Sequence, residues 1–166
     1  IELFVGNPRN GRSKTFIIGR EIDVLISINY LFLIERDLIS LPRLLAFNIH
    51  GSLLPKYRGR TPHVWAIINN EKQTGITAHL IDDNCDTGAI LRQVAIQISD
   101  GDTGNDLLKK YEQEYPKLIE AVLADIAAGN LRLTPQNDEI ATYFGKRTPE
   151  DGLINWSWQK DRIYNW

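Results

Sequence analysis

The apolar run from residue 22 to residue 28 constrains the fold of this chain most strongly. It is a near-continuous series rich in isoleucine, leucine and valine, typical of a strand buried on both faces of a parallel sheet. A short helical turn at 35–40, stopped by Pro42, separates it from a second strand at 45–50. This order of strand, crossover and strand predicts an α/β fold built on a parallel sheet, with ligands bound beyond the carboxyl ends of its strands.

The remainder of the chain alternates helices and strands. The expected elements are a helix opened by Thr61 and Pro62, strands at 75–81 and 89–98, a helix from Asp102 or Thr103 to Ala128, and short strands at 131–133 and 142–144. Pro116 is expected to kink or split the long helix, because proline lacks the N–H that a helix interior uses.

Composition bounds the class of protein. With 166 residues, 43% hydrophobic and 24% charged, the chain is expected to form one domain, or one domain with a short appendage. A net charge of −2 argues against broad nucleic-acid binding, and no apolar stretch reaches the length of a membrane span. The single cysteine, Cys85, excludes an internal disulfide and fits a reducing, cytoplasmic location. No signal peptide opens the chain, and the absence of methionine suggests that the natural N-terminus is missing.

Asn48 and His50 form the first candidate pair for chemistry. Side chains alternate along a strand, so these two share one face at its carboxyl end. The amide can donate to an oxygen that gains charge, and the imidazole can move a proton. The alternative is a polar strand end whose side chains bond to nearby backbone.

The loop at 51–60 follows this pair directly. It combines serine, proline, two glycines, one lysine and two arginines. Glycine permits close backbone approach, and the arginine fork suits a carboxylate or a phosphate. A solvated basic loop explains the same composition.

The acidic loop at 82–88 allows a metal interpretation and a catalytic one. Its Asp, Asn, Asp spacing resembles a calcium loop, but Thr87 and Gln93 stand where such a loop needs glycine and glutamate. One cysteine and three scattered histidines give no zinc spacing, so no metal is expected. We expect Asp86 to orient His50 and to favour its charged form, because adjacent strands of a parallel sheet end on the same side.

Other polar and aromatic residues carry less weight. His79, within a strand, is interpreted as a satisfied core histidine, and Cys85 has no nearby base that would make it a nucleophile. His63, in the first turn of a helix, lies either near the site or on the surface. The tryptophans near the chain end either stack on a base or fill a core or an interface.

Three motifs together resemble the folate-dependent formyltransferases. They are residues 48–59 (Asn-Ile-His-Gly-Ser-Leu-Leu-Pro-Lys-Tyr-Arg-Gly), 75–77 (Gly-Ile-Thr) and 86–88 (Asp-Thr-Gly). The match runs from about Ile22 to Trp166. Residues 59–65 and 144–152 look like the sugar N-formyltransferases that act on dTDP-linked amino-dideoxyhexoses.

The resemblance implies a Rossmann-like fold and N10-formyltetrahydrofolate as the formyl donor. It places Asn48, His50 and Asp86 on the family's catalytic trio. The positions implied for folate binding are Phe32, Leu33, Ile34, Ser52, Leu53, Leu54, Pro55, Arg60, Asp82, Asp83, Asn84 and Cys85. Residues expected near the nucleotide sugar are Lys56, Tyr57, Arg58, His63, Lys146, Arg147 and Trp156.

The implied reaction is attack of a sugar amine on the formyl carbon. Asn48 and a protonated His50 would stabilise the oxyanion, His50 would shuttle a proton, and Asp86 would hold the imidazole. The expected partner is a nucleotide sugar, the expected setting is lipopolysaccharide O-antigen biosynthesis, and a homodimer is left open.

The chain departs from the family pattern at both ends. Family members have a further strand, helix and strand before the first buried strand. In this sequence only a loop-like stretch stands there, so we expect the chain to be marginally stable. Residues 1–133 are interpreted as an N-terminally incomplete catalytic domain, and 134–166 as the start of a truncated region for substrate binding or dimerisation. The alternatives are a methionyl-tRNA formyltransferase fragment and a non-catalytic, folate-binding remnant.

Overall fold

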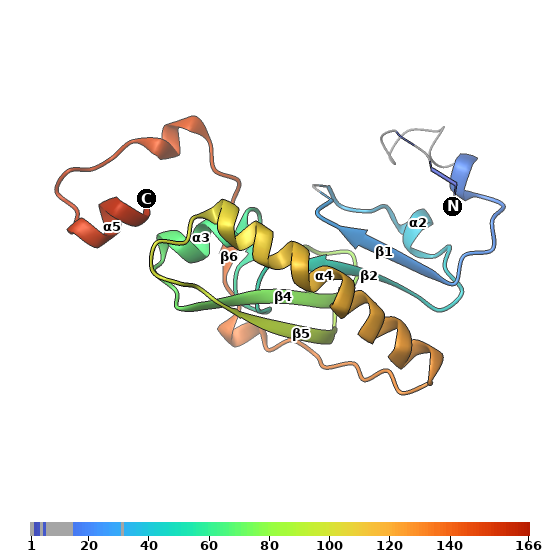
Figure 1. Cartoon of the computed structure of the whole chain (residues 1–166). Helices are drawn as coiled ribbons and strands as arrows, with labels where there is room; N and C mark the ends of the chain where they lie inside the picture. The colour runs from blue at the N-terminus through green and yellow to red at the C-terminus, as the bar shows by residue number, and fades with distance from the viewer. Residues whose placement is uncertain (1, 4, 6–14, 31) are drawn as a thin grey trace.

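A four-stranded mixed sheet forms the centre of the molecule (Figure 1). The computed structural model describes residues 2–3, 5, 15–30 and 32–166. The strands, in spatial order, are β1 (Val24–Ile28), β2 (Leu45–His50), β4 (Gln73–Leu80) and β5 (Ile90–Gln97). β1 and β2 are parallel, whereas β2–β4 and β4–β5 are antiparallel. The predicted α/β fold with parallel strands is confirmed, and the second half of the sheet adds an antiparallel hairpin to it.

The two faces of β2 differ in chemistry, as the alternation of its side chains predicts. Phe47 and Ile49 are buried on one face. Their cross-strand neighbours on β4, Leu80 and Ala78, pack into the same core. Asn48 and His50 take the opposite side of the pleat, paired in register with His79 and Thr77. The apolar face therefore holds the sheet to its covering helix, and the polar face is left for the site.

The long helix α4 (Gly104–Ala127) covers the apolar face of the sheet (Figure 1). Thr103 caps its N-terminus by accepting from the Asp106 N–H, and the Asp106 carboxylate accepts in turn from the Thr103 N–H. Pro116 lies inside one continuous helix, so the alternative that it splits the helix is wrong. Tyr115 and Leu118 are buried on either side of it, and this packing outweighs a proline cost of about 3 kcal/mol.

Shorter elements join the sheet to the rest of the chain. They are α2 (Arg36–Ile39), β3 (Arg58–Gly59), α3 (Pro62–Ile68), β6 (Tyr143–Phe144), α5 (Lys160–Asn165) and the 3₁₀ turns Asp138–Ile140 and Pro149–Gly152. β3 and β6 pair as a second, two-stranded parallel sheet. Thr61 stands at the N-cap of α3, but its side chain makes no capping bond.

Two further findings complete the fold. The strand expected at 131–133 does not form; a single bridge between Ile90 and Thr134 takes its place. In the described part of the chain, no helix combines the length and the apolar character that a membrane crossing requires.

Candidate active site

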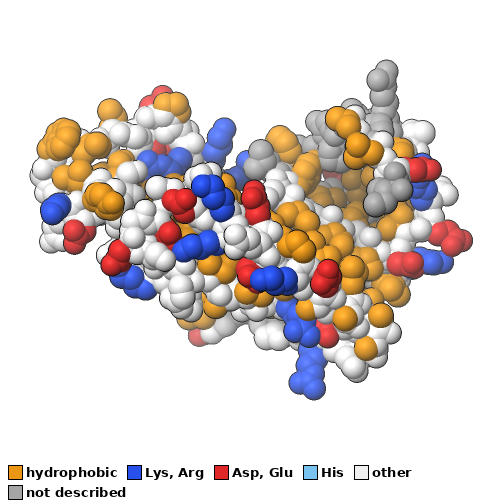
Figure 2. Space-filling view, viewed as in Figure 1, with side chains coloured by type: hydrophobic (Ala, Val, Ile, Leu, Met, Phe, Trp, Pro, Cys, Tyr) orange, Lys and Arg blue, Asp and Glu red, His pale blue; other side chains and the backbone are white. Residues whose placement is uncertain are grey.

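A cleft of about 520 Å³ opens at the carboxyl end of β2. One wall comes from the segment after β1, including Tyr30, Phe32 and Ile34. The other walls come from the turn before α3, the loop after β4, and aromatic side chains of α4. Figure 2 shows apolar side chains gathered beside α4 toward the β1 edge. The cleft therefore joins an apolar surface to the polar face of β2.

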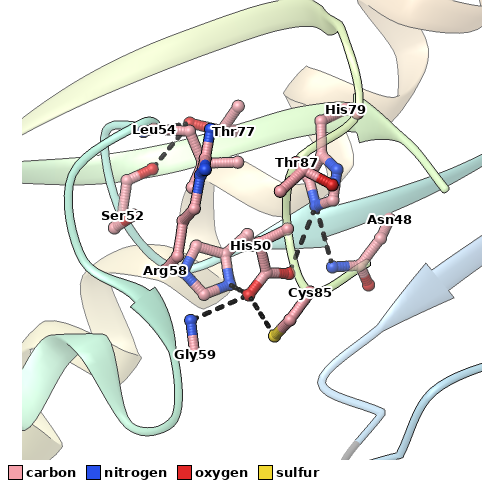
Figure 3. Close-up of polar contacts among 12 residues, drawn as sticks. Asn48, His50, Ser52, Leu54, Arg58, Gly59, Thr77, His79, Cys85 and Thr87 are labelled. Carbon is pink, nitrogen blue, oxygen red and sulfur yellow. Dashed lines mark hydrogen bonds and ion pairs between the residues drawn. The ribbon is translucent and has the colours of Figure 1, made fainter. Parts of the chain in front are cut away.

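The structure brings Asn48, His50 and Asp86 together in this cleft. Nδ1 of His50 lies 3.5 Å from Oδ2 of Asp86. The amide nitrogen of Asn48 lies 3.2 Å from Nε2 of His79, which is itself 3.5 Å from Oδ1 of Asp86. Figure 3 shows Asn48, His50 and His79 directed toward this common centre. One carboxylate thus lies between two imidazoles, with an amide beside the second.

Asp86 reaches His50 by a route that differs from the expected one. Because β4 is antiparallel to β2, Leu80 near its end pairs with Phe47, away from the carboxyl end of β2. The loop after β4 must therefore turn back toward the cleft. Asp86 adopts a positive φ of 57° within it, a conformation that aspartate tolerates better than most residues. The Gly59 N–H donates to Oδ2 of Asp86 at 2.9 Å and fixes the carboxylate.

His50 is held in a neutral form with a defined tautomer. Its Nε2 lies 2.8 Å from the carbonyl oxygen of Tyr57, and a carbonyl can only accept, so Nε2 carries the proton. Burial lowers the pKa of His50, and the opposing effect of Asp86 is smaller. The attraction of Asp86 favours the charged form of His50, as expected, but removal from water outweighs it, so the pKa of His50 lies below its ordinary value.

Asp86 remains ionised. Burial by itself would raise its pKa, but the neighbouring imidazoles of His79 and His50 and the hydrogen bond from the Gly59 N–H together hold the pKa well below the usual range of an aspartate. The neighbouring Cys85 thiol donates to Oδ2 of Asp86 at 3.3 Å. Burial, together with this carboxylate, raises the pKa of Cys85 to about 11, so the thiol is no nucleophile at neutral pH.

His79 belongs to the site, which corrects its interpretation as a core residue. It is buried, with 4% of its side chain exposed, yet it lines the cleft, and its Nε2 faces Asn48 and Asp86 while its Nδ1 faces the Leu80 carbonyl. The two-residue period of a strand places Thr77 and His79 on one face. The sequence does not reveal that this face continues that of Asn48, because the register between β2 and β4 is a long-range property.

The folate positions implied by the resemblance fall into two groups. Those that line the cleft are Phe32, Leu33, Ile34, Arg60, Asp82, Asn84 and Cys85. Asp83 lies outside the lining and forms an ion pair with Arg36. Ser52, Leu53, Leu54 and Pro55 also lie outside it. There the Thr77 hydroxyl donates to the Ser52 carbonyl at 2.6 Å, and Gln93 donates to the Leu54 carbonyl at 2.8 Å. These bonds tie the turn to β4 and β5.

The positions expected near a nucleotide sugar are scattered. His63 lines the cleft, whereas Lys56, Lys146 and Trp156 are exposed on the surface. Arg147 stacks over the rings of Trp65 and Trp166, at 5.5 and 4.3 Å from the ring centroids, and donates to the Asp151 carbonyl.

Tyr57 and Arg58 serve the structure of the loop itself. The Tyr57 ring stacks on Phe144 and its hydroxyl donates to Glu71. The Arg58 side chain is 2% exposed and donates to Gln136, Asp138 and Tyr143. These contacts bury the Arg58 side chain of β3 against Tyr143 of β6 and the segment at 136–138.

Hydrogen bonds within the acidic loop at 82–88 hold its conformation. Thr87 Oγ1 donates to both carboxylate oxygens of Asp82 at 2.7 Å, and the Asn84 N–H donates to Oδ1. Across the described ranges, histidine, cysteine and acidic side chains form no group of three arranged to hold a metal ion.

A family model described as formyl transferase matches residues 17–123 of the chain. The chain belongs to the formyl transferase family. Among curated relatives of this family, the bifunctional polymyxin resistance protein ArnA of Wigglesworthia glossinidia brevipalpis is 39% identical over 143 residues. That match covers 86% of this chain and 22% of ArnA.

Solved structures of sugar formyltransferases share the fold. WlaRD, a sugar 3N-formyl transferase crystallised in the presence of dTDP and 5-N-formyl-THF, is 28% identical with a TM-score of 0.73, covering 86% of this chain and 52% of its own. The N-formyltransferase from Helicobacter canadensis is 28% identical with a TM-score of 0.72, covering 84% and 52%. PseJ from Anoxybacillus kamchatkensis is 26% identical with a TM-score of 0.68, covering 86% and 71%. The chain thus spans about a fifth of ArnA and about half of the first two structures.

Proposed function

We propose that this chain transfers a formyl group from N10-formyltetrahydrofolate to the amine of a nucleotide-linked amino sugar. The observation that carries the proposal is the cluster of Asn48, His50 and Asp86 at the carboxyl end of β2, in a cleft of a formyl transferase fold. An amide donor, a neutral imidazole and an ionised carboxylate are the groups that acyl transfer to an amine uses.

The residues of the cleft fit a formylated folate. Apolar side chains from the segment after β1 offer a surface for a flat ring, and the polar loop after β4 lines the same cleft with hydrogen-bonding groups of Asp82, Asn84 and Asp86. The Arg60 guanidinium, 6.0 Å from the Phe32 ring centroid, suits the carboxylates of a glutamyl tail. When bound, the folate supplies the activated formyl carbon that the amine attacks.

His50 acts as the base in this proposal. With Nε2 bonded to the Tyr57 carbonyl, Nδ1 is the nitrogen left to take the proton of the amine, and the same proton would pass to the folate nitrogen when its bond to the formyl carbon breaks. Protonation there turns the contact with Asp86 into an attraction between opposite charges, so the imidazolium gains an acceptor at each nitrogen. This order differs from the expected one, in which His50 begins charged.

Asn48 acts as the donor to the developing oxyanion. Its amide carries two N–H groups, of which one is directed to His79. The second is available to an oxygen in the cleft. One preorganised donor of this kind typically contributes about 10²–10³ in rate.

The finer identity of the acceptor is also part of the proposal. We place a dTDP-linked amino-dideoxyhexose at this site, in lipopolysaccharide O-antigen biosynthesis in the cytoplasm. WlaRD was crystallised with dTDP, and the Helicobacter canadensis enzyme with folinic acid and dTDP-3-aminofucose. PseJ was crystallised with a UDP-linked 4-formamido sugar and tetrahydrofolate, so UDP is the competing nucleotide. Arg147 and Lys146 are the cations proposed for the pyrophosphate.

Mass spectrometry of the reaction products tests the proposal. The chain would be incubated with N10-formyltetrahydrofolate and, separately, with dTDP-3-amino, dTDP-4-amino and UDP-4-amino sugars or methionyl-tRNA. We expect a gain of one formyl group on a dTDP-amino sugar. Formylation of methionyl-tRNA alone would support that alternative. Binding of a folate analogue by a folded chain without any turnover would identify a non-catalytic remnant.

A further inference from the structure

We propose that His79 is a positioning residue that sets which end of the Asn48 side-chain amide faces the cleft. The inference rests on the proposed function and concerns the same site. Asn48 on β2 and His79 on β4 are directly opposite in the antiparallel register, and the pairing of β4 with β5 is irregular at Ala78 and His79. Such irregularities re-aim side chains beside functional sites.

The tautomer of His79 is fixed by the backbone. Its Nδ1 lies 2.8 Å from the carbonyl oxygen of Leu80. A carbonyl can only accept, so Nδ1 carries the proton and, in the neutral ring, Nε2 is an acceptor. Because the ring is buried, water does not compete for Nε2. A backbone group that cannot flip therefore determines what His79 offers to its neighbour.

That acceptor determines the orientation of Asn48. The amide has a donor end and an acceptor end, which a half-turn of its terminal torsion exchanges. Nε2 of His79, at 3.2 Å, attracts the nitrogen end and repels the oxygen end. With the nitrogen held there, the second N–H is kept for the cleft. The opposite orientation would leave the carbonyl beside the nitrogen lone pair of His79.

The groups that face the His79 ring differ in what they offer to Nε2. They are the Leu80 carbonyl, the Asn48 amide, Oδ1 of Asp86 at 3.5 Å, and the His50 ring at 6.4 Å between centroids. The Asn48 nitrogen, at 3.2 Å, can donate to Nε2, whereas Oδ1 of Asp86 can only accept and lies farther away. A rival role is that His79 acts only through Asp86. If His79 acts through Asn48, the effect of replacing His79 should disappear when Asn48 is absent. If His79 acts only through Asp86, the effect should persist without Asn48.

A double-mutant cycle with Asn48 separates these roles. His79→Leu removes the acceptor and keeps a buried side chain, whereas His79→Gln keeps an oxygen that can accept. If His79 acts through Asn48, His79→Leu should lower single-turnover formyl transfer by up to the worth of one oxyanion donor, about 10²–10³-fold. His79→Gln should restore much of the rate, and the KM for folate should change little. In an Asn48→Ala background, His79→Leu should change the rate by no more than about twofold, since its target is already absent.

Two outcomes would overturn the inference. One is an equal loss from His79→Leu in both backgrounds, which would show an effect independent of Asn48. The other is full activity of folded His79→Leu.

A measurement that needs no turnover completes the test. ¹⁵N NMR of the histidine rings should show His79 protonated at Nδ1 and not at Nε2, and His79→Gln should shift the Asn48 side-chain amide signals. The opposite tautomer would contradict the inference. Absence of turnover in the wild-type chain would refute the proposed function but leave this result on His79 standing.

Discussion

Nδ1 of His50 faces Oδ2 of Asp86 at 3.5 Å, and both side chains are largely withdrawn from water, at 7% and 13% exposed. In the neutral ring this nitrogen bears a lone pair, so the contact brings no attraction until His50 is protonated. The contact therefore contributes little attraction while His50 is neutral, and in the proposed reaction it would stabilise the positive charge that proton transfer to His50 creates.

Asp86→Asn should remove this stabilisation while keeping the shape of the side chain. We expect kcat to fall by about 10²-fold or more, within the range of lost acid–base help, and the KM for folate to change less. Steady-state kinetics measures both. Asp100→Asn, which removes an exposed carboxylate beside Lys72, is the matched control and should leave kcat unchanged. Equal kcat for Asp86→Asn and wild type would contradict the role of the carboxylate.

The pH profile should reveal the neutral base. Burial lowers the pKa of His50 from its ordinary value of 6.5, and a base works only when unprotonated. The rate constant kcat/KM should therefore rise with pH, with its acidic limb below pH 6.5, and should be level at neutral pH. A reaction that needs His50 charged at the outset would instead lose activity as the pH rises through its pKa. Rates of the chain between acidic and neutral pH distinguish these two forms.

Arg58 should prove structural. Its side chain donates to Gln136, Asp138 and Tyr143 from the interior, and each bond to a charged group is worth about 1.5–3 kcal/mol. Arg58→Ala should lower the free energy of unfolding by at least the worth of one such bond, as measured by urea denaturation. Arg43→Ala, at an exposed ion pair with Asp23, is the control and should cost about 1 kcal/mol or less. A raised KM for the nucleotide sugar with unchanged stability would support the substrate-binding interpretation instead.

Arg147 tests the proposed nucleotide site. Arg147→Glu places a negative charge where a pyrophosphate is proposed, so the KM for the nucleotide sugar should rise while the KM for folate stays near the wild-type value. Arg132→Glu, on an exposed residue after α4, controls for the change in total charge. An unchanged KM for the nucleotide sugar would count against the proposed role.

The alternation of residues along a single strand predicts the part of the site that lies on β2. The bounds of β2 at Leu45–His50 and the shared face of Asn48 and His50 follow from strand alternation and are confirmed. The contact of Asp86 with His50 was also anticipated, but its reason was wrong, because the direction of β4 is not encoded in its own periodicity.

Long-range pairing accounts for what the sequence did not show. The place of His79 beside Asn48 in the cleft was not predicted, because it depends on the register of β4 against β2. Arg58 looked like an exposed member of a basic loop because its partners, Gln136, Asp138 and Tyr143, follow about eighty residues later in the chain. The continuity of α4 through Pro116 likewise depends on tertiary packing, which propensity does not include.

Single-turnover formyl transfer by His50→Ala tests the central claim most directly. The variant loses the base, so the rate should fall by about 10²–10⁴-fold, while circular dichroism and binding of a folate analogue remain like those of the wild type. Combination with Asp86→Asn should add little, because the two residues act as a unit. A folded His50→Ala chain that transfers formyl groups at the wild-type rate would contradict the account.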